Sequence, residues 1–498
     1  MNTPHSTPAP LSDVSCYRAL AARDSRFDGV FFVGIKTTGI YCRPICTAKT
    51  ARASSCTFYA SAAAAEAAGF RPCLRCRPEL APYALQQNLA YAVWQRIAAG
   101  ALNHRDEQDS GDLEQLAQEV GLSSRQLRRV LVQHFGVTPI ELAQTQRLLF
   151  AKKLLQETAL PMAVLADAAG FGSVRRFNAL FSERYGMAPT AVRRQLKASA
   201  AQEADNVTVR LAYRPPFAWE TMLRYLQRRL IGGVEAVQLE QEQSAYMRSV
   251  RIDGVSGWLR VTHLPPQQQL EVHVAPSLTP SLMPLLSRLR MQFDLDANPA
   301  LIAQHLQQDP LLAQLLDAHA GIRIPGAFDA FELAVRAVLG QQVSVAGATT
   351  VAGRLAQRFG TPCATPFAAV SHHFPAAEQL AEVSALELAT IGLPKTRAQT
   401  ILNLARFAAQ GHLQMKPGVT LQEAVAQLKT VAGIGDWTAQ YIALRALRFP
   451  DAFPAGDLGL QKAVVPGTRL SERQLAAHAA PWAPWRGYAA LLLWHSLG

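Results

Sequence analysis

Four of the seven cysteines stand in two close pairs. Cys42 and Cys46 lie in the stretch YCRPICTAKT, and Cys73 and Cys76 lie in RPCLRCRPE. The spacings C-x3-C and C-x2-C offer four soft sulfur ligands, which is the set that a tetrahedral zinc site takes. We therefore expect one Zn²⁺ ion held by these four residues. On spacing alone, such a site is more often a structural staple than a reactive centre.

A second candidate site lies near the C-terminus. In LKTVAGIGDWTAQYIALRAL, Gly433 and Gly435 flank Ile434 between two expected helices. Such a turn allows backbone N–H groups to approach a phosphate. Further on, Asp457 stands in FPAGDLGLQKAV. Taken singly, the glycines are more often a simple turn, and an aspartate before a helix is more often its N-cap.

The charge of the chain favours a polyanionic partner. The 498 residues carry a formal net charge of +12, and such a balance is typical of proteins that bind nucleic acid or an anionic surface. Taken alone, the surplus suits a plain solubility charge equally well. Lys and Arg outnumber Asp and Glu ten to five in residues 1–80 and twelve to seven in residues 112–197. The excess of positive charge therefore lies in the first two-fifths of the chain.

The composition also bears on the compartment. No apolar run reaches the roughly 18 residues that a membrane-spanning helix needs. The start, MNTPHSTPAPLSDVS, has neither a basic nor an apolar signal region. An odd number of cysteines in a long chain of this kind favours a reducing cytosol. We therefore expect a cytoplasmic protein without membrane association, and we expect Cys16, Cys56 and Cys363 to be core thiols.

Two segments in the middle of the chain repeat one pattern. LEQLAQEVGLSSRQLRRVLVQHFGVTPIELA begins at Leu113, and MAVLADAAGFGSVRRFNALFSERYGMAPTAVR begins at Met162. Each has a short apolar helix, a glycine, a serine and a longer helix closed by aromatic-Gly-x-x-Pro. A single copy would suit a plain helical hairpin, but two in register favour a pair of DNA-binding helix-turn-helix motifs. The arginines early in the second helices are the expected DNA contacts: Arg125, Arg128, Arg129, Arg175 and Arg176.

The remaining segments complete a multidomain chain, mainly α with α+β parts. Runs such as VTVRLAY, YMRSVRI, GWLRVTHL and LEVHV alternate with period two and predict an antiparallel sheet. WETMLRYLQRRL and SLMPLLSRLRMQF predict helices packed on that sheet. Polar linkers are expected at 100–112 and 197–206. We predict a small zinc-binding α+β module (1–84), an all-α double helix-turn-helix domain (85–197), a TBP-like α+β unit (206–325) and an all-α helix-hairpin-helix domain (326–498).

The front of the chain resembles two known families. The repeated helical pair is similar to the AraC-type DNA-binding domain, in which both recognition helices read one groove face, and Gln126 and Asn178 could add contacts to base edges. IKTTGIYCRPIC followed by TFYASAAAAEAAGFRPCLRC resembles the N-terminal module of Ada-type DNA repair and response proteins. That resemblance implies that Cys42 is both a zinc ligand and the nucleophile that takes a methyl group from a DNA methylphosphotriester. We expect the nearby Arg43, Arg71, Arg75 and Arg77 to hold phosphate.

The C-terminal half resembles AlkA-type 3-methyladenine DNA glycosylase II, a helix-hairpin-helix enzyme. Beside the two motifs, GIRIPGAFDAFELAVRAVLGQQVSVAGA and APWRGYAALLLW carry the resemblance over residues 207–498. It implies that Asp457 is the catalytic carboxylate, that Gly433 and Gly435 contact the DNA backbone, and that Trp437, Tyr441 and Trp494 form an aromatic pocket for the flipped base. Taken singly, each aromatic residue would more often belong to the core.

Three departures from these families refine the expected activity. Relatives that also cut the strand carry a lysine where Trp437 stands, so we predict a glycosylase without lyase activity. Gln342 replaces the usual apolar wedge. The only cysteine after Cys76 is Cys363, in TPCATP, without the Pro-Cys-His-Arg site of a guanine-O6 methyl acceptor.

The combined expectation is an alkylation-response protein. It would accept methyl groups irreversibly, activate transcription from promoter DNA with RNA polymerase as partner, and excise alkylated bases such as 3-methyladenine from double-stranded DNA. The alternative is a DNA-binding regulator whose C-terminal half senses lesions without catalysis.

Overall fold

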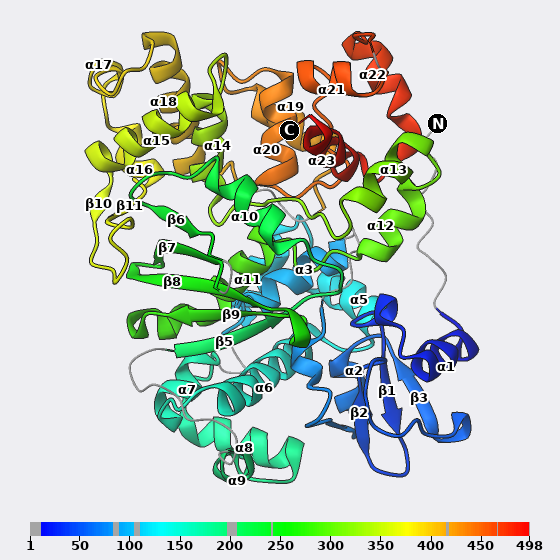
Figure 1. The fold of residues 1–498 in the computed structure, drawn as a ribbon. Coiled ribbons are helices and arrows are strands. Elements are labelled where there is room, and N and C mark those ends of the chain that lie inside the picture. Colours follow the sequence, from blue (N-terminus) through cyan, green and yellow to red (C-terminus); the bar gives the residue numbers. More distant parts are fainter. Residues whose placement is uncertain are drawn as a thin grey trace. The chain divides into compact units, whose positions relative to one another are not determined.

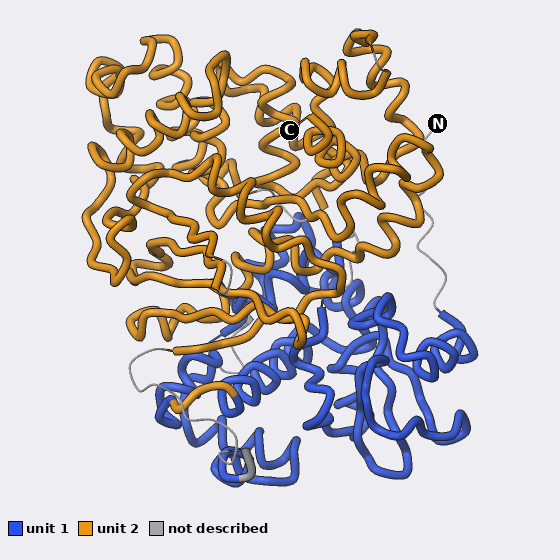
Figure 2. Tube along the Cα trace, viewed as in Figure 1, with its two compact units in different colours: residues 1–156, 160–201 blue, residues 157–159, 202–498 orange. Residues whose placement is uncertain are grey.

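The computed structural model describes residues 11–82, 89–103, 110–196, 207–240, 243–414, 418–465 and 467–497. The chain forms two compact units, residues 1–156 with 160–201 and residues 157–159 with 202–498 (Figure 2). The predicted joint at 197–206 and the predicted boundary near residue 84 lie outside the described residues. Within the described ranges, no helix combines the length and the hydrophobicity that crossing a bilayer requires.

The first unit begins with a small sheet in the order β3-β1-β2-β4 (Figure 1). Strand β1 pairs antiparallel with β2 and β3, whereas β2 and β4 run parallel. Two helices accompany the sheet. The bounds are α1 (Asp13–Ala22), β1 (Phe32–Ile35), β2 (Ile40–Cys42), β3 (Cys56–Tyr59), α2 (Ala62–Ala67) and β4 (Arg71–Pro72). This confirms the predicted small α+β module.

The rest of the first unit is helical, as predicted. Its helices are α3 (Leu89–Ala98), α4 (Ser110–Glu119), α5 (Ser124–Phe135), α6 (Pro139–Glu157), α7 (Met162–Ala168), α8 (Val174–Tyr185) and α9 (Pro189–Leu196). The predicted linker at 100–112 ends earlier than expected, because α4 already begins at Ser110. The pairs α4–α5 and α7–α8 are the two predicted helix-turn-helix motifs.

The two longer helices of these pairs are built alike. Helix α5 has a capping box in which Ser123 and Gln126 bond each other's backbone, and α8 has Ser173 as its N-cap. Both helices end at a glycine in the left-handed region, Gly136 at φ 76° and Gly186 at φ 68°. Each buries three side chains spaced four residues apart: Leu127, Leu131 and Phe135 in α5, and Phe177, Phe181 and Tyr185 in α8.

The second unit begins with a five-stranded antiparallel sheet in the order β5-β9-β8-β7-β6. The strands are β5 (Val207–Ala212), β6 (Glu235–Gln238), β7 (Ala245–Ile252), β8 (Val255–Leu264) and β9 (Gln269–Val274). Four of these were predicted, and β6 was not. Helices α10 (Trp219–Gln227) and α11 (Leu282–Gln292) pack on the sheet. The ring of Phe293, at the end of α11, lies 5.3 Å from that of Trp219 in α10 and 5.6 Å from that of Tyr246 in β7.

Helices form the remainder of the second unit, apart from the short pair β10 (Thr361–Pro362) and β11 (His372–His373). They are α12 (Pro299–Leu306), α13 (Pro310–Ala318), α14 (Ala330–Leu339), α15 (Val345–Phe359), α16 (Ala377–Ala381), α17 (Ala385–Ala389), α18 (Lys395–Ala409), α19 (Leu421–Lys429), α20 (Asp436–Arg445), α21 (Leu458–Ala463), α22 (Glu472–His478) and α23 (Arg486–Ser496). The α+β unit and the helical domain are thus as predicted.

Candidate functional site

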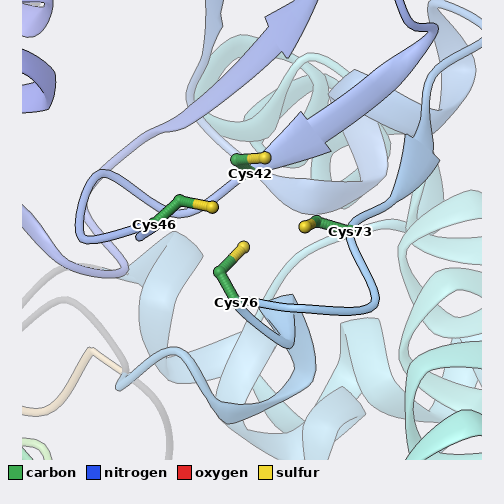
Figure 3. A group of neighbouring side chains, drawn as sticks. All are labelled: Cys42, Cys46, Cys73 and Cys76. Atoms are coloured by element: carbon green, nitrogen blue, oxygen red, sulfur yellow. The ribbon is translucent and has the colours of Figure 1, made fainter. Parts of the chain in front are cut away.

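The four paired cysteines meet at one point of the first unit. Figure 3 shows the side chains of Cys42, Cys46, Cys73 and Cys76 turned toward one another. Their sulfur atoms all lie within 4.8 Å of one another. A tetrahedral zinc ion with Zn–S bonds of about 2.3 Å needs sulfur atoms about 3.8 Å apart. Four thiols at this spacing therefore fit zinc.

The local fold brings the two pairs together. Cys42 ends strand β2, and the backbone N–H of Cys73 donates to Tyr41 O at 3.0 Å beside the β2–β4 pairing. A turn after Cys42, in which the Cys46 N–H donates to Arg43 O at 3.1 Å, places Cys46 beside the other three cysteines. The backbone N–H of Arg43 also lies 3.3 Å from Cys76 Sγ, which orients that sulfur.

The expectation that Arg43 holds phosphate is wrong. Its guanidinium is buried, forms a two-point ion pair with Asp28, and donates to Cys76 O at 3.1 Å. The buried carboxylate satisfies this charge, so Arg43 braces the cysteine loop. Arg77 pairs with Glu79 at 3.1 Å. Arg71 and Arg75 are exposed and stay candidates for phosphate contacts.

Buried ion pairs connect this module to the helices behind it. Lys152 of α6 is about 1% exposed, and its Nζ lies 2.6 Å from Glu79 and 3.3 Å from Cys73 O. Glu66 accepts from Tyr41 at 2.9 Å and pairs with Arg184 of α8 at 3.2 Å. Burial raises the pKa of Glu66 to about 7, although Arg184 opposes it.

The recognition helices present most of the expected arginines. Arg125, Arg128, Arg129 and Arg175 are exposed, because the apolar face of each helix points into the core, and Arg176 is half-buried. Exposed cations at the start of such a helix suit phosphate and base contacts. The Oε1 of Gln126 accepts from the Ser123 N–H at 3.0 Å, so that side chain serves its own helix.

The glycine turn lies between α19 and α20. Gly433 has φ 94°, and a Cβ there would lie 2.0 Å from Thr400 Oγ1, so only glycine suits the position. Gly435 is the N-cap of α20, and a Cβ there would meet nothing within 4 Å. Both residues are exposed. The open N-terminus of α20 can therefore receive a backbone phosphate.

Asp457 combines the two roles that the sequence left open. Its Oδ1 accepts from Leu460 N–H at 3.0 Å as the N-cap of α21. The indole of Trp494 donates to the same oxygen at 3.2 Å, and the indole of Trp437 donates to Oδ2 at 3.0 Å. Three donors hold this carboxylate in a single orientation.

The carboxylate faces an aromatic cavity. Asp457, Trp437, Tyr441 and Trp494 line a cavity of about 410 Å³. The rings of Trp437 and Tyr441 stack with centroids 5.3 Å apart and planes 9° apart, and Trp494 stands edge-on to Tyr441 at 6.4 Å. The predicted catalytic and pocket residues thus come together, from α20, α21 and α23.

Gln342 lies beside this cavity rather than in its wall. It is exposed in the loop between α14 and α15, with φ 56°. The side chain of the neighbouring Gln341 connects this loop to the glycine turn between α19 and α20. Its Nε2 donates to Gly433 O at 3.1 Å and to Thr438 Oγ1 at 3.0 Å. Val343 does line the cavity.

Sequence reasoning missed the polar end of the cavity. Tyr225 and Arg229 come from α10 and the turn after it, and Arg445 comes from the end of α20. The Tyr225 and Tyr441 hydroxyls lie 3.4 Å apart although 216 positions separate them. No local sequence pattern predicts this contact between Tyr225 and Tyr441. Of the expected core thiols, Cys16 and Cys56 are buried, but Cys363 is only half-buried.

Family comparisons agree with this architecture. Residues 15–79 match the metal binding domain of Ada, and residues 116–195 match a helix-turn-helix domain. Residues 208–329 match the AlkA N-terminal domain, and residues 335–474 match the HhH-GPD superfamily base excision DNA repair protein. The fold and the two sites therefore define a DNA-binding repair protein with an Ada-type zinc module and a helix-hairpin-helix glycosylase. The ends of the four predicted domains stay predictions.

Relatives cover both the whole chain and its parts. A protein of Mycobacterium tuberculosis named probable bifunctional transcriptional activator/DNA repair enzyme AlkA is 40% identical over 494 residues, covering 97% of this chain and 96% of that protein. The chain belongs to this family of bifunctional activator and repair proteins. The Escherichia coli DNA-3-methyladenine glycosylase 2 is 34% identical over 58% of this chain and 97% of its own length. The Escherichia coli Ada protein is 35% identical over 36% of this chain and 48% of its own length.

Proposed function

We propose that this chain repairs alkylated DNA by two separate reactions and regulates the response to the damage. The front half transfers a methyl group from a DNA methylphosphotriester to Cys42. The back half excises alkylated bases such as 3-methyladenine by hydrolysis. The observation that carries the proposal is the carboxylate of Asp457, held by two indole N–H groups in the wall of an aromatic cavity.

The acceptor reaction needs one reactive sulfur. A zinc ion held by Cys42, Cys46, Cys73 and Cys76 would keep the four sulfurs deprotonated at neutral pH. The Sγ of Cys42 attacks the methyl carbon, the carbon–oxygen bond breaks, and its electron pair stays on the phosphate as a phosphodiester anion. No leaving group remains to regenerate the thiolate, so each chain reacts once. Four thiolates and one divalent ion are net negative, and methylation removes one negative charge.

That loss of charge supports the regulatory role. A less negative cluster opposes DNA phosphates less, so the exposed Arg71 and Arg75 can hold the backbone more firmly. Helices α5 and α8 would then read promoter DNA through Arg125, Arg128, Arg129, Arg175 and Arg176. We propose RNA polymerase as the further partner and the cytoplasm as the place of action, since a relative of this family is named a transcriptional activator and DNA repair enzyme.

Base excision would occur in the cavity of the second unit. The aromatic faces of Trp437, Tyr441 and Trp494 favour a cationic alkylated purine by stacking and cation–π attraction. The bond between C1′ and the base breaks, and its electron pair neutralises the departing base. Positive charge develops on the sugar, and the Asp457 carboxylate stabilises it. Water then adds at C1′ and releases a proton.

The cavity supports a hydrolytic enzyme without lyase activity. Strand cleavage through a Schiff base requires an amine near C1′. The position that would supply it holds Trp437, whose indole N–H is bonded to Asp457, and no lysine is among the described residues that line the cavity. The exposed Gln342 would fill the gap that the flipped nucleotide leaves, while Gly433 and Gly435 bind the DNA backbone.

One experiment tests both reactions on the full chain. The protein is incubated with methylated duplex DNA, methylation of the protein is measured by mass spectrometry, and released bases are separated by chromatography. We expect one methyl group on Cys42 and free 3-methyladenine. Cys42→Ala should lose the methyl uptake while keeping base release, and Cys56→Ala, a buried thiol outside the cluster, should keep both. Methyl groups on Cys46, Cys73 or Cys76 would refute the choice of nucleophile.

A further inference from the structure

The polar end of the base cavity holds two tyrosines among arginines. Arg445 is 4% exposed, and its Nη1 donates to the Tyr441 hydroxyl oxygen at 2.6 Å while its Nε donates to Pro325 O at 2.6 Å. The Tyr225 hydroxyl lies 3.4 Å from that of Tyr441. The guanidinium of Arg229 lies 3.8 Å from the centroid of the Tyr225 ring.

Within the described parts of the chain, no ion pair joins Arg229, Arg336 or Arg445 to an acidic side chain, although all three line the cavity. The Nε of Arg336 is buried with no hydrogen-bond partner. Arg445 is buried, and Arg229 and Arg336 are half-buried. A buried guanidinium without a counter-charge is costly, so this end of the cavity favours an anion.

We propose that Tyr441 meets this demand as a phenolate and forms an anionic wall of the base pocket, held by Arg445 and opposite in character to the neutral aromatic rings beside it. The phenolate oxygen accepts from Arg445 and from the Tyr225 hydroxyl, which keeps its own proton. The displaced proton passes to solvent. This proposal rests on the proposed glycosylase function. It adds to that function a residue, Tyr441, whose ionisation sets the charge of the base pocket.

The charged groups around Tyr441 come from every neighbouring element. Helix α20 supplies Arg445, α10 and its following turn supply Tyr225 and Arg229, and α14 supplies Arg336. Four acidic side chains also line the cavity: Glu235 on β6, Asp329 and Glu332 at the start of α14, and Asp457 at the start of α21. Glu332 is occupied by Arg248 at 2.8 Å, and Glu235 by the Tyr246 hydroxyl and the Ile231 N–H.

The balance of these groups sets the ionisation. Burial alone would raise the pKa of Tyr441, but Arg445 and Arg229 outweigh it and lower the pKa to about 7, against an ordinary value near 10. Burial raises the pKa of Tyr225, so one proton remains in the pair. Tyr441 is therefore neutral in mild acid and becomes charged as the pH rises through neutrality.

The consequence is a pH-dependent preference for charged lesions. A phenolate stacked on Trp437 attracts a purine cation, whereas it gives a neutral base no such advantage. Excision of 3-methyladenine relative to hypoxanthine, a neutral purine, should rise by roughly tenfold between about pH 6 and about pH 8. Tyr441→Phe keeps the ring but cannot ionise, so its ratio should stay flat.

A spectroscopic titration tests the phenolate without relying on catalysis. The near-ultraviolet tyrosinate band of the full chain is followed from about pH 6 to about pH 9. We expect one tyrosine to ionise near neutrality, and that step should vanish in Tyr441→Phe. In Arg229→Gln it should move to higher pH. Tyr59→Phe, which removes a tyrosine whose pKa burial raises, should leave the step unchanged.

The two readouts separate this inference from the proposed function. A chain that releases no 3-methyladenine but shows the tyrosinate step would refute the glycosylase and keep the phenolate. A chain that excises the base with no such step, or with the same step in Tyr441→Phe, would overturn the phenolate alone. A pH-independent ratio of the two lesions in the wild-type chain would overturn its role in selectivity.

Discussion

Asp457→Asn separates the two roles of this carboxylate, because asparagine caps a helix about as well as aspartate. The amide oxygen can take the place of Oδ1 and keep the bonds from Leu460 and Trp494. The amide nitrogen then faces the indole N–H of Trp437, which loses its acceptor. A hydrogen bond to a charged group contributes about 1.5–3 kcal/mol, and the half-exposed position favours the lower value.

The effect on excision should be far larger than the effect on folding. Removing one preorganised group that stabilises transition-state charge costs about 100- to 1000-fold in rate, or about 2.7–4 kcal/mol. Release of 3-methyladenine from alkylated duplex, measured in single-turnover experiments, should therefore fall by at least about 100-fold. The urea unfolding free energy should change by no more than about 2 kcal/mol.

The chain offers a matched control for this substitution. Asp309 is the N-cap of α13, its Oδ1 accepts from Leu311 and Leu312, and its Oδ2 accepts from the indole of Trp482 at 2.9 Å. It does not line the base cavity. Asp309→Asn should be destabilised about as much as Asp457→Asn. Its excision activity should equal that of the wild-type chain. Base release by Asp457→Asn within about tenfold of wild type would reduce Asp457 to a helix cap, as the regulator without catalysis requires.

Three further outcomes follow from buried charges and from the cavity wall. Lys152→Met leaves the buried Glu79 with Arg77 as its remaining ion-pair partner and should destabilise the first unit by up to about 3 kcal/mol in chemical denaturation, whereas the double variant with Glu79→Leu should recover most of that loss. Burial raises the pKa of Glu66 from 4.5 to about 7 in the folded state, so the contribution of its protonated form to stability is complete below about pH 4.5 and is lost as the pH rises through 7. The stability of Glu66→Gln relative to wild type should therefore increase across that window by on the order of 3 kcal/mol. The same stability difference between the two chains at about pH 4.5 and at about pH 7.5 would contradict this. Borohydride should trap no covalent complex with abasic DNA, since Trp437 occupies the place of an amine, and a trapped complex would show that another residue supplies it.

Much of the two sites could be predicted because their signals are local. The cysteine spacings predict four ligands, and the structure gathers those four sulfurs. The apolar period of the recognition helices predicts which face is buried, so it also predicts that Arg125 and Arg128 are exposed. Arg43 shows the limit of such reasoning. Its neighbours in sequence suggest a surface cation, but its partner Asp28 lies 15 positions away.

The amino-acid sequence by itself determined the order of the modules, the metal ligands and the repeated helical pair, since each depends on residue type and short-range spacing. The aromatic residues of the cavity were implied by the family resemblance. Tertiary structure alone decided that Asp457 is at once a helix cap and the acceptor of two indoles, and that Tyr225 meets Tyr441 beside Arg445. The physical reason is that burial and charge act through space. A side chain's ionisation depends on which distant groups the fold places within a few ångströms of it.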